Sequence, residues 1–212
     1  EAESHIPLDI EDVVVQHIVL RKTREKSHIL AASVQKDDLL DRFDILDDAG
    51  IDPHFVDMDV FCLYQALVDT GVTADHPNAV VVSAQSHSTA LLFLQEGELW
   101  SVRSLRMGTH GIHAAGSSDV ESVDLETARA HDYLGRLGRE IRRTMTSLPN
   151  AEFSAVLTTG SGSRIPGFAE AVGPAFGLSA EPLDLLSRVD HKLDPEQAEQ
   201  LGPDIGVALG TA

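Results

Sequence analysis

Hydrophobic and polar positions divide the first quarter of the chain into two apolar runs and one amphipathic segment. The runs 12–21 (DVVVQHIVLR) and 27–35 (SHILAASVQ) predict two strands, and the charged stretch KTREK between them predicts a hairpin turn. Over 36–49 the apolar residues recur at helical spacing, and Gly50 follows where a left-handed cap is favoured. A short strand is predicted at 54–57. The order strand, strand, helix, strand indicates a small α+β unit.

The remaining pattern predicts a mixed α/β domain. A helix is expected at 60–70, followed by a meander of three strands at 79–84, 90–95 and 99–105, with Glu96-Gly97 as the turn between the last two. A loop rich in glycine and serine (108–122) precedes a long helix. Four further segments complete the pattern: that helix at 125–148, a strand at 153–157, a helix at 166–176 and a final helix that begins at Gln197 or Asp204 and ends at Leu209.

Charge and composition narrow the classes of function. The chain has 16 basic and 34 acidic residues, a net charge of −18, which disfavours nucleic acid and anionic lipid as partners. Cys62 is the single cysteine and lies in an apolar segment, so a buried thiol in a reducing compartment is expected. No apolar run is long enough to span a bilayer. The sequence has no initiator methionine, so we interpret it as a fragment.

A small-residue loop is the sharpest local signal for chemistry. Residues 158–168 (TTGSGSRIPGF) follow a predicted strand and precede a predicted helix, so backbone amides could approach a phosphate or a purine closely. The pattern has neither the lysine of a Walker loop nor the spacing of a dinucleotide fold, and a tight turn between strand and helix explains it as well. The candidate nucleotide-contacting residues are Gly160, Ser161, Gly162 and Ser163.

Three other clusters have simpler explanations beside functional ones. A stripe of aspartates on the predicted helix 36–49 is either a solvated face or a site for a basic peptide; it consists of Asp37, Asp41, Asp44 and Asp48. The basic cluster of the long helix is either a solvated face or a dock for an acidic partner; it consists of Arg136, Arg139, Arg142 and Arg143. His110 and His113 have metal-ligand spacing but lie in a glycine-rich loop, so no metal site is predicted.

Ordered motifs across the chain resemble the PilM/GspL family of actin-like proteins related to FtsA. The loop at 160–168 is similar to the adenosine motif of that superfamily, and IPLDIEDVVVQHIVL resembles the family's strand entry. Further similarity lies in Ala49-Gly50-Ile51, in Gly97-x-Leu99 with the following Arg103-Ser104-Leu105-Arg106-Met107-Gly108, and in the closing Gly206-Val-Ala-Leu209. The resemblance implies an α/β (mixed α+β) actin-like, ribonuclease H-like fold that lacks its first N-terminal lobe. It implies an interaction subdomain at 1–58 and a second lobe with the adenosine loop at 59–212.

The second phosphate loop of the resemblance departs from the family pattern. That loop carries an aspartate and a glycine at positions where this chain has Ser83 and Gln85, followed by Ser88 and Thr89. A serine cannot supply the charge that holds a magnesium shell, and a glutamine side chain lies where backbone would cup a phosphate. We therefore expect no catalytic residues, no ATP hydrolysis and no resident cofactor, with ATP as the ligand that only the full-length protein would take.

The resemblance implies a non-enzymatic scaffold of a type II secretion system or type IV pilus platform. Such a protein lies in the cytoplasm at the inner membrane and links platform proteins to the secretion or assembly ATPase. It reaches the membrane through partners or through a C-terminal anchor beyond this sequence, and a homodimer is compatible with it. The alternative is a nucleotide-binding protein of the PilM or FtsA type that binds ATP and the cytoplasmic tail of a membrane partner.

Overall fold

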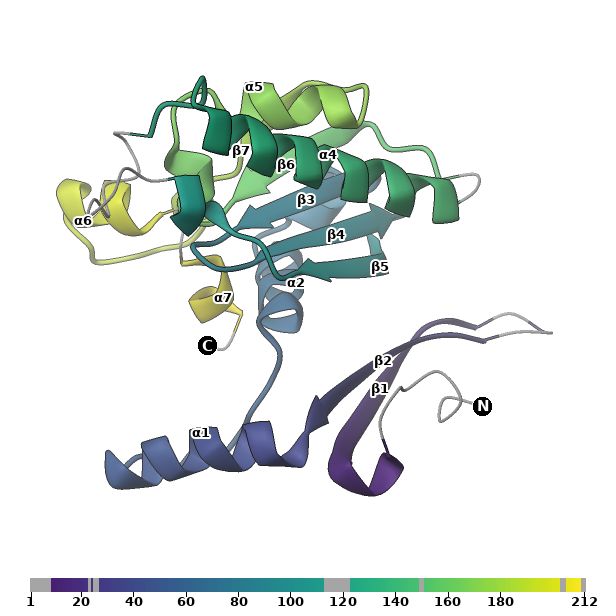
Figure 1. Ribbon diagram of the computed structural model, residues 1–212, viewed down its shortest axis with the longest axis vertical. Coiled ribbons are helices and arrows are strands. Elements are labelled where there is room, and N and C mark those ends of the chain that lie inside the picture. The colour runs from purple at the N-terminus through teal and green to yellow at the C-terminus, as the bar shows by residue number, and fades with distance from the viewer. Residues whose placement is uncertain are drawn as a thin grey trace. The chain divides into compact units, whose positions relative to one another are not determined.

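The computed structural model divides the chain into two compact units, Glu1–Asp57 and Met58–Ala212 (Figure 1). It describes residues 9–22, 24, 27–112, 123–148, 151–202 and 205–210. The units are described separately below. Within the described parts of the chain, every helix is too short or too polar to span a lipid bilayer.

The first unit is a β-hairpin followed by a helix. A short 3-10 turn, η2 (Ile10–Asp12), leads into β1 (Val13–Lys22), which pairs antiparallel with β2 (Ser27–Gln35). Helix α1 (Lys36–Asp48) follows β2 directly, and the Lys36 ammonium donates a hydrogen bond to the carbonyl of Glu11 at 2.5 Å. The predicted hairpin and helix are confirmed.

This unit buries little of its apolar surface. Among its described residues only Val13 is buried. Large apolar side chains stay exposed on both strands and on the helix, among them Ile18, Val19, Ile29, Leu40 and Ile45. The described part of the unit therefore has no hydrophobic core of its own. Its exposed apolar side chains add no stability through burial, because they stay in contact with water.

The predicted strand at 54–57 is wrong. The structure has no regular element between α1 and the helix that begins at Asp59, and Phe55 is 94% exposed. A strand exists only where a neighbouring strand accepts and donates its backbone hydrogen bonds, and residues 54–57 belong to neither of the two sheets in the described part of the chain. The first unit is therefore a strand–strand–helix unit.

The second unit is a five-stranded mixed sheet with helices on both faces. The strand order is β5-β4-β3-β6-β7; β3, β4 and β5 form an antiparallel meander, and β3, β6 and β7 run parallel. The strands are β3 (Ala79–Ala84), β4 (Thr89–Gln95), β5 (Glu98–Leu105), β6 (Ala155–Thr159) and β7 (Ala180–Pro182). The helices are α2 (Asp59–Asp69), α3 (Val72–Asp75), α4 (Ala128–Ser147), α5 (Phe168–Val172), α6 (Pro195–Leu201) and α7 (Gly206–Leu209), with 3-10 turns η3 (Thr109–Ile112), η4 (Ser161–Arg164), η5 (Gly173–Ala175) and η6 (Leu186–Arg188).

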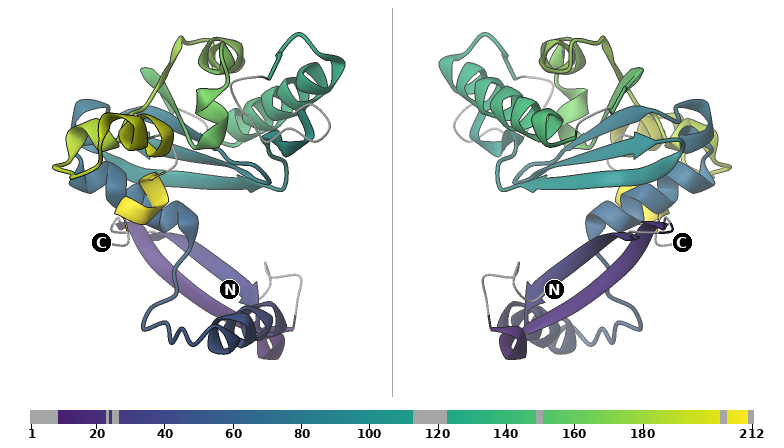
Figure 2. Two further views of the ribbon diagram at one scale, coloured as in Figure 1. Left: turned by 90° about the vertical axis from the view of Figure 1, so that its left-hand side faces the viewer. Right: turned by 90° about the vertical axis from the view of Figure 1, so that its right-hand side faces the viewer.

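The central strand β3 is buried along its whole length, because helices cover both faces of the sheet. Figures 1 and 2 show α4 and α5 on one face and α2 on the other. On the α4 face, Val80, Val82 and Phe93 pack with Leu137 and Ile141 in one core cluster. Helix α2 buries Leu63 and Leu67 together with Cys62, so the predicted buried thiol is confirmed. Burying both faces explains why β3 is a continuous apolar run rather than an alternating one.

Two local predictions need correction and one is confirmed. The meander turn has left-handed backbone at both Glu96 (φ 55°) and Gly97 (φ 79°), as a two-residue hairpin of type I′ requires. The helix predicted at 166–176 is shorter: α5 begins at Phe168, because Gly167 is left-handed (φ 78°), and a 3-10 turn follows. The predicted final helix is two helices, α6 and α7.

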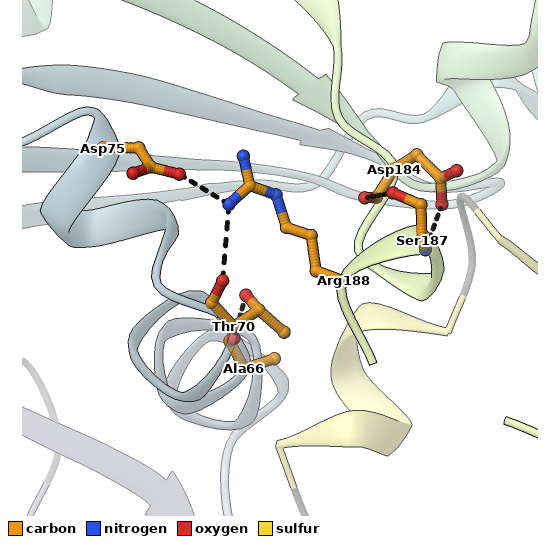
Figure 3. Close-up of polar contacts among 6 residues, drawn as sticks. All are labelled: Ala66, Thr70, Asp75, Asp184, Ser187 and Arg188. Atoms are coloured by element: carbon orange, nitrogen blue, oxygen red, sulfur yellow. Dashed lines mark hydrogen bonds and ion pairs between the residues drawn. The ribbon is translucent and has the colours of Figure 1, made fainter. Parts of the chain in front are cut away.

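An ion pair joins the end of the α2–α3 segment to η6. Figure 3 shows the guanidinium of Arg188 donating to the carboxylate of Asp75 at 2.7 Å and to the carbonyl of Thr70 at 3.3 Å. The hydrogen bond from Arg188 and its positive charge hold the pKa of the Asp75 carboxyl below its ordinary value. Asp184 caps the η6 turn by accepting hydrogen bonds from the backbone N–H groups of Leu186 and Ser187. The ion pair and these capping hydrogen bonds together position η6, which precedes α6 in the chain.

Candidate functional site

The two loops singled out from the sequence lie next to each other. Strands β3 and β6 are parallel neighbours in which Ser83 pairs with Thr159, so the loops that follow them emerge at the same edge of the sheet. Ligands of open α/β sheets bind at the carboxyl ends of parallel strands. The degenerate phosphate loop at 83–89 and the glycine loop at 160–163 therefore form one candidate site.

Glycines in the second loop allow this close approach. Gly160 has φ 82° and ψ 174°, and a Cβ placed on it would lie 2.5 Å from the carbonyl oxygen of Ala84. A Cβ on Gly162 would lie 2.7 Å from the Cβ of Ala84 and 2.9 Å from the Cγ2 of Thr109. The loop then winds into η4, where the Ser163 hydroxyl donates to the Gly160 carbonyl at 2.7 Å. Any residue larger than glycine at 160 or 162 would force the loops apart.

Several backbone groups of the first loop already have hydrogen-bond partners within the protein. The N–H of Gln85 donates to the carbonyl of Ser88 at 2.8 Å, and the Gln85 carbonyl accepts from the N–H of Thr109 at 3.0 Å. The N–H of His110 donates to the carbonyl of Ser86 at 2.8 Å. The 109–110 backbone thus closes over the turn between β3 and β4. Thr109 is fully buried, and the sequence pattern gave no signal for its role.

Ser83 and Thr89 are buried beside this loop. The hydroxyl of Thr89 donates to the carbonyl of Met107 at 2.8 Å and lies 3.0 Å from the hydroxyl of Tyr133 on α4. Burial raises the pKa of Tyr133, so its phenol stays protonated well into the alkaline range. Thr89 therefore fastens α4 and the segment after β5 to the sheet. Ser83 is 5% exposed near the end of β3.

The side chain of Gln85 extends toward the glycine loop. Its Nε2 atom lies 2.9 Å from the position that a Cβ on Gly160 would take. The amide thus lies between the two loops. In the part of the chain that the structure describes, no group of three or more His, Cys, Asp or Glu side chains could hold a metal ion. The rings of His87 and His110 lie 5.0 Å apart, and His113 falls outside the described residues.

The aspartate stripe of α1 is fully solvated. All four predicted residues (Asp37, Asp41, Asp44 and Asp48) are exposed, and none has a recorded ion pair within the described residues. The stripe belongs to the first unit, whereas the two loops belong to the second. It remains a candidate surface for a basic peptide.

The second unit also has a basic surface, which combines residues that are far apart in the sequence. Two adjoining hollows of ≈ 520 Å³ and ≈ 410 Å³ lie along α4 and the end of β5. We name this surface the arginine groove; its basic residues are Arg106, Arg129, Arg136 and Arg139. Of the predicted basic cluster, Arg136 and Arg139 line the groove, whereas Arg142 and Arg143 do not. Arg106 follows the strand predicted at 99–105, and no sequence pattern indicated that the end of this strand lies beside the long helix.

Comparisons with known proteins identify the fold. No protein-family model and no curated protein matches the chain. A solved PilM–PilN type IV pilus biogenesis complex contains a chain with a TM-score of 0.77 and 23% identity, matched over 99% of this chain and 68% of the other.

MreB5 of Spiroplasma citri bound to AMPPNP matches with a TM-score of 0.50 and 11% identity, over 84% of this chain and 64% of that one. The structural neighbours are proteins of the actin-like ATPase fold. The predicted likeness to PilM is thus confirmed as a likeness of fold, and the chain has a mixed α/β fold of the actin-like class.

Proposed function

We propose that this chain is part of a type IV pilus biogenesis protein that acts as a non-enzymatic cytoplasmic scaffold at the inner-membrane platform. The observation that supports this most is the fold match to a PilM–PilN complex over 99% of the chain. The partner would be an inner-membrane pilus protein, and the scaffold would connect it to the assembly ATPase. A type II secretion scaffold of the GspL kind shares this reasoning and differs in its partner.

The residues at the candidate site support the non-enzymatic part of the proposal. Hydrolysis of ATP needs a magnesium ion held by a carboxylate and a loop whose backbone is free to surround the phosphates. Here Ser83 replaces the carboxylate, and the Gln85 N–H is already donated to Ser88. The Gln85 amide, next to Gly160, would also have to move before a phosphate could enter.

Thermal unfolding of the protein that contains this chain tests the nucleotide question. We expect Mg-ATP at about 1 mM to leave the melting temperature unchanged within about 1 °C, because a ligand without a site cannot favour the folded state. A site filled at 100 times its Kd would add about 2.7 kcal/mol to the unfolding free energy and shift the transition by several degrees. A shift of that size with Mg-ATP, absent with ATP and a chelator, would favour the alternative of an ATP-binding protein.

The aspartate stripe is the surface of this scaffold that would accept a basic partner segment. Its four carboxylates recur every three or four residues on α1, so they follow one side of the helix over about 17 Å. All are exposed, so a lysine- or arginine-rich tail could reach them without displacing any internal ion pair. Electrostatic contacts of this kind accelerate association and weaken with salt.

Charge reversal on α1 tests that surface. We expect Asp41→Lys with Asp44→Lys to weaken binding of the platform partner's cytoplasmic tail at least tenfold in calorimetry at low salt. Glu152→Lys with Asp190→Lys makes the same charge change on exposed residues of the second unit and should leave the affinity within about threefold. Equal losses in the two double variants would mean that overall charge, and not the stripe, causes the effect. No loss in either variant would mean that the stripe is not part of the interface.

A further inference from the structure

The arginine groove holds an excess of positive charge on a strongly acidic chain. Four arginines line its two hollows, against two carboxylates, Asp132 and Glu140. All four arginines are exposed, and no ion pair joins any of them to a carboxylate within the described residues. Their charges are therefore available to a ligand. At physiological salt the electric field of these charges extends about 8 Å, so the acidic residues elsewhere in a chain of net charge −18 do not cancel it locally.

The floor and walls of the groove come from three elements. Met107 and Ile112, from the segment after β5, and the ring of Tyr133 on α4 give it an apolar lining between the charges. Arg106 contributes from the β5 side and Arg136 from α4, and both residues line both hollows, so the two hollows adjoin along α4. Figure 1 shows α4 lying along the sheet above β4, with β5 as the edge strand.

The spacing of the arginines indicates the shape of the ligand. Arg129, Arg136 and Arg139 span ten residues of helix, or about 15 Å at 1.5 Å per residue. Such a row cannot converge on one phosphate group, but it matches an extended peptide of about five residues at about 3.3 Å each. Because side chains alternate along an extended chain, every second residue would face α4, which places two or three carboxylates opposite the arginines.

Competing ligand classes fit the groove less well. A nucleic acid would meet the repulsion of the whole chain, and its phosphates lie on a convex surface rather than in a hollow. A flat anionic membrane would reach the rim of a hollow and not its lining. An acidic peptide with occasional apolar side chains uses both the arginines and the apolar floor.

We propose that the arginine groove binds an acidic, extended peptide segment of a partner protein. The groove shares no lining residue with the loops at 83–89 and 160–163 or with the α1 stripe, although Met107 and Tyr133 in its lining contact Thr89. It adds a second, oppositely charged docking site to the chain. The proposal does not depend on whether the protein acts at a pilus.

The test is fluorescence anisotropy with labelled deca-glutamate as the probe and deca-glutamine as the neutral control. We expect the protein to bind deca-glutamate alone, with an affinity that falls as salt rises. Arg136→Glu with Arg139→Glu should raise the Kd at least tenfold. The matched control is Arg142→Glu with Arg143→Glu, which makes the same charge change on exposed residues of α4 that do not line the groove; it should change the Kd less than threefold.

Three results would overturn the proposal. They are failure of the unmodified protein to bind deca-glutamate, equal losses in the two double variants, and binding to phosphatidylglycerol vesicles in preference to the peptide. Circular dichroism confirms that each variant is folded. If the glutamate pair does not fold, Arg136→Gln with Arg139→Gln replaces it and should still weaken binding at least threefold.

Discussion

Replacing Gly160 by alanine should lower the unfolding free energy by about 2–6 kcal/mol. Two costs add: a side chain at φ 82° and ψ 174° is strained by about 1–3 kcal/mol, and overpacking costs about 1–3 kcal/mol more. The new Cβ would lie 2.5 Å from the Ala84 carbonyl oxygen, so the two loops would have to separate. Urea unfolding of both proteins, followed by circular dichroism, measures the difference.

Gly177→Ala is the matched control. Gly177 also has a positive φ, 71°, but a Cβ there would meet nothing within 4 Å. It should therefore show only the backbone cost of a left-handed alanine, about 1–2 kcal/mol. If the two variants lose the same free energy, the contact between the loops is looser than the structure describes.

Gly210→Ala should detach α7 from α2. A Cβ on Gly210 would lie 1.6 Å from the carbonyl oxygen of Cys62 and 2.4 Å from its carbonyl carbon, and both are backbone atoms that cannot rotate away. We expect a loss of about 3 kcal/mol or more, because the helix must move as a unit. Gly206 has the same role more mildly, since its Cβ would lie 2.9 Å from the Cδ1 of Leu63.

Cys62 provides a second readout of that change. It is buried, and it is the single cysteine of the chain. Detachment of α7 should therefore speed its reaction with a thiol reagent in native buffer. Gly111→Ala is the control, because a Cβ there meets nothing within 4 Å and the residue has no positive φ. A Gly210→Ala protein with unchanged stability and unchanged thiol reactivity would contradict the described packing.

The sequence predicted those elements whose signal is local. The hairpin at β1 and β2, helix α1 and the meander each carry their own periodicity and turn residues, so tertiary context had little to change. Residues 54–57 have strand-like composition but join neither sheet of the described chain, which a local pattern cannot reveal. Strand β7 has three residues, one of them Pro182, and exists because β6 provides an edge for it. Such strands depend on the sheet rather than on their own sequence.

The candidate site was predictable in its parts but not in its arrangement. The glycine loop and the degenerate phosphate loop were both recognisable from residue types, and parallel pairing of β3 with β6 brings them together. The approach of the Gln85 amide to Gly160 depends on side-chain direction, which spacing does not encode. The arginine groove was missed for a related reason, because Arg106 and α4 are separated by more than 20 residues.

The exposed apolar surface of the first unit has a consequence for protein engineering. Ordering each residue of a chain costs about 1–2 kcal/mol of conformational entropy, and only buried apolar area compensates for most of it. With Val13 as the one buried side chain among its described residues, the hairpin and α1 lack that compensation. The first unit is therefore a poor candidate for transplantation: grafted onto another scaffold, it would carry its aspartate stripe without the means to hold the helix in shape.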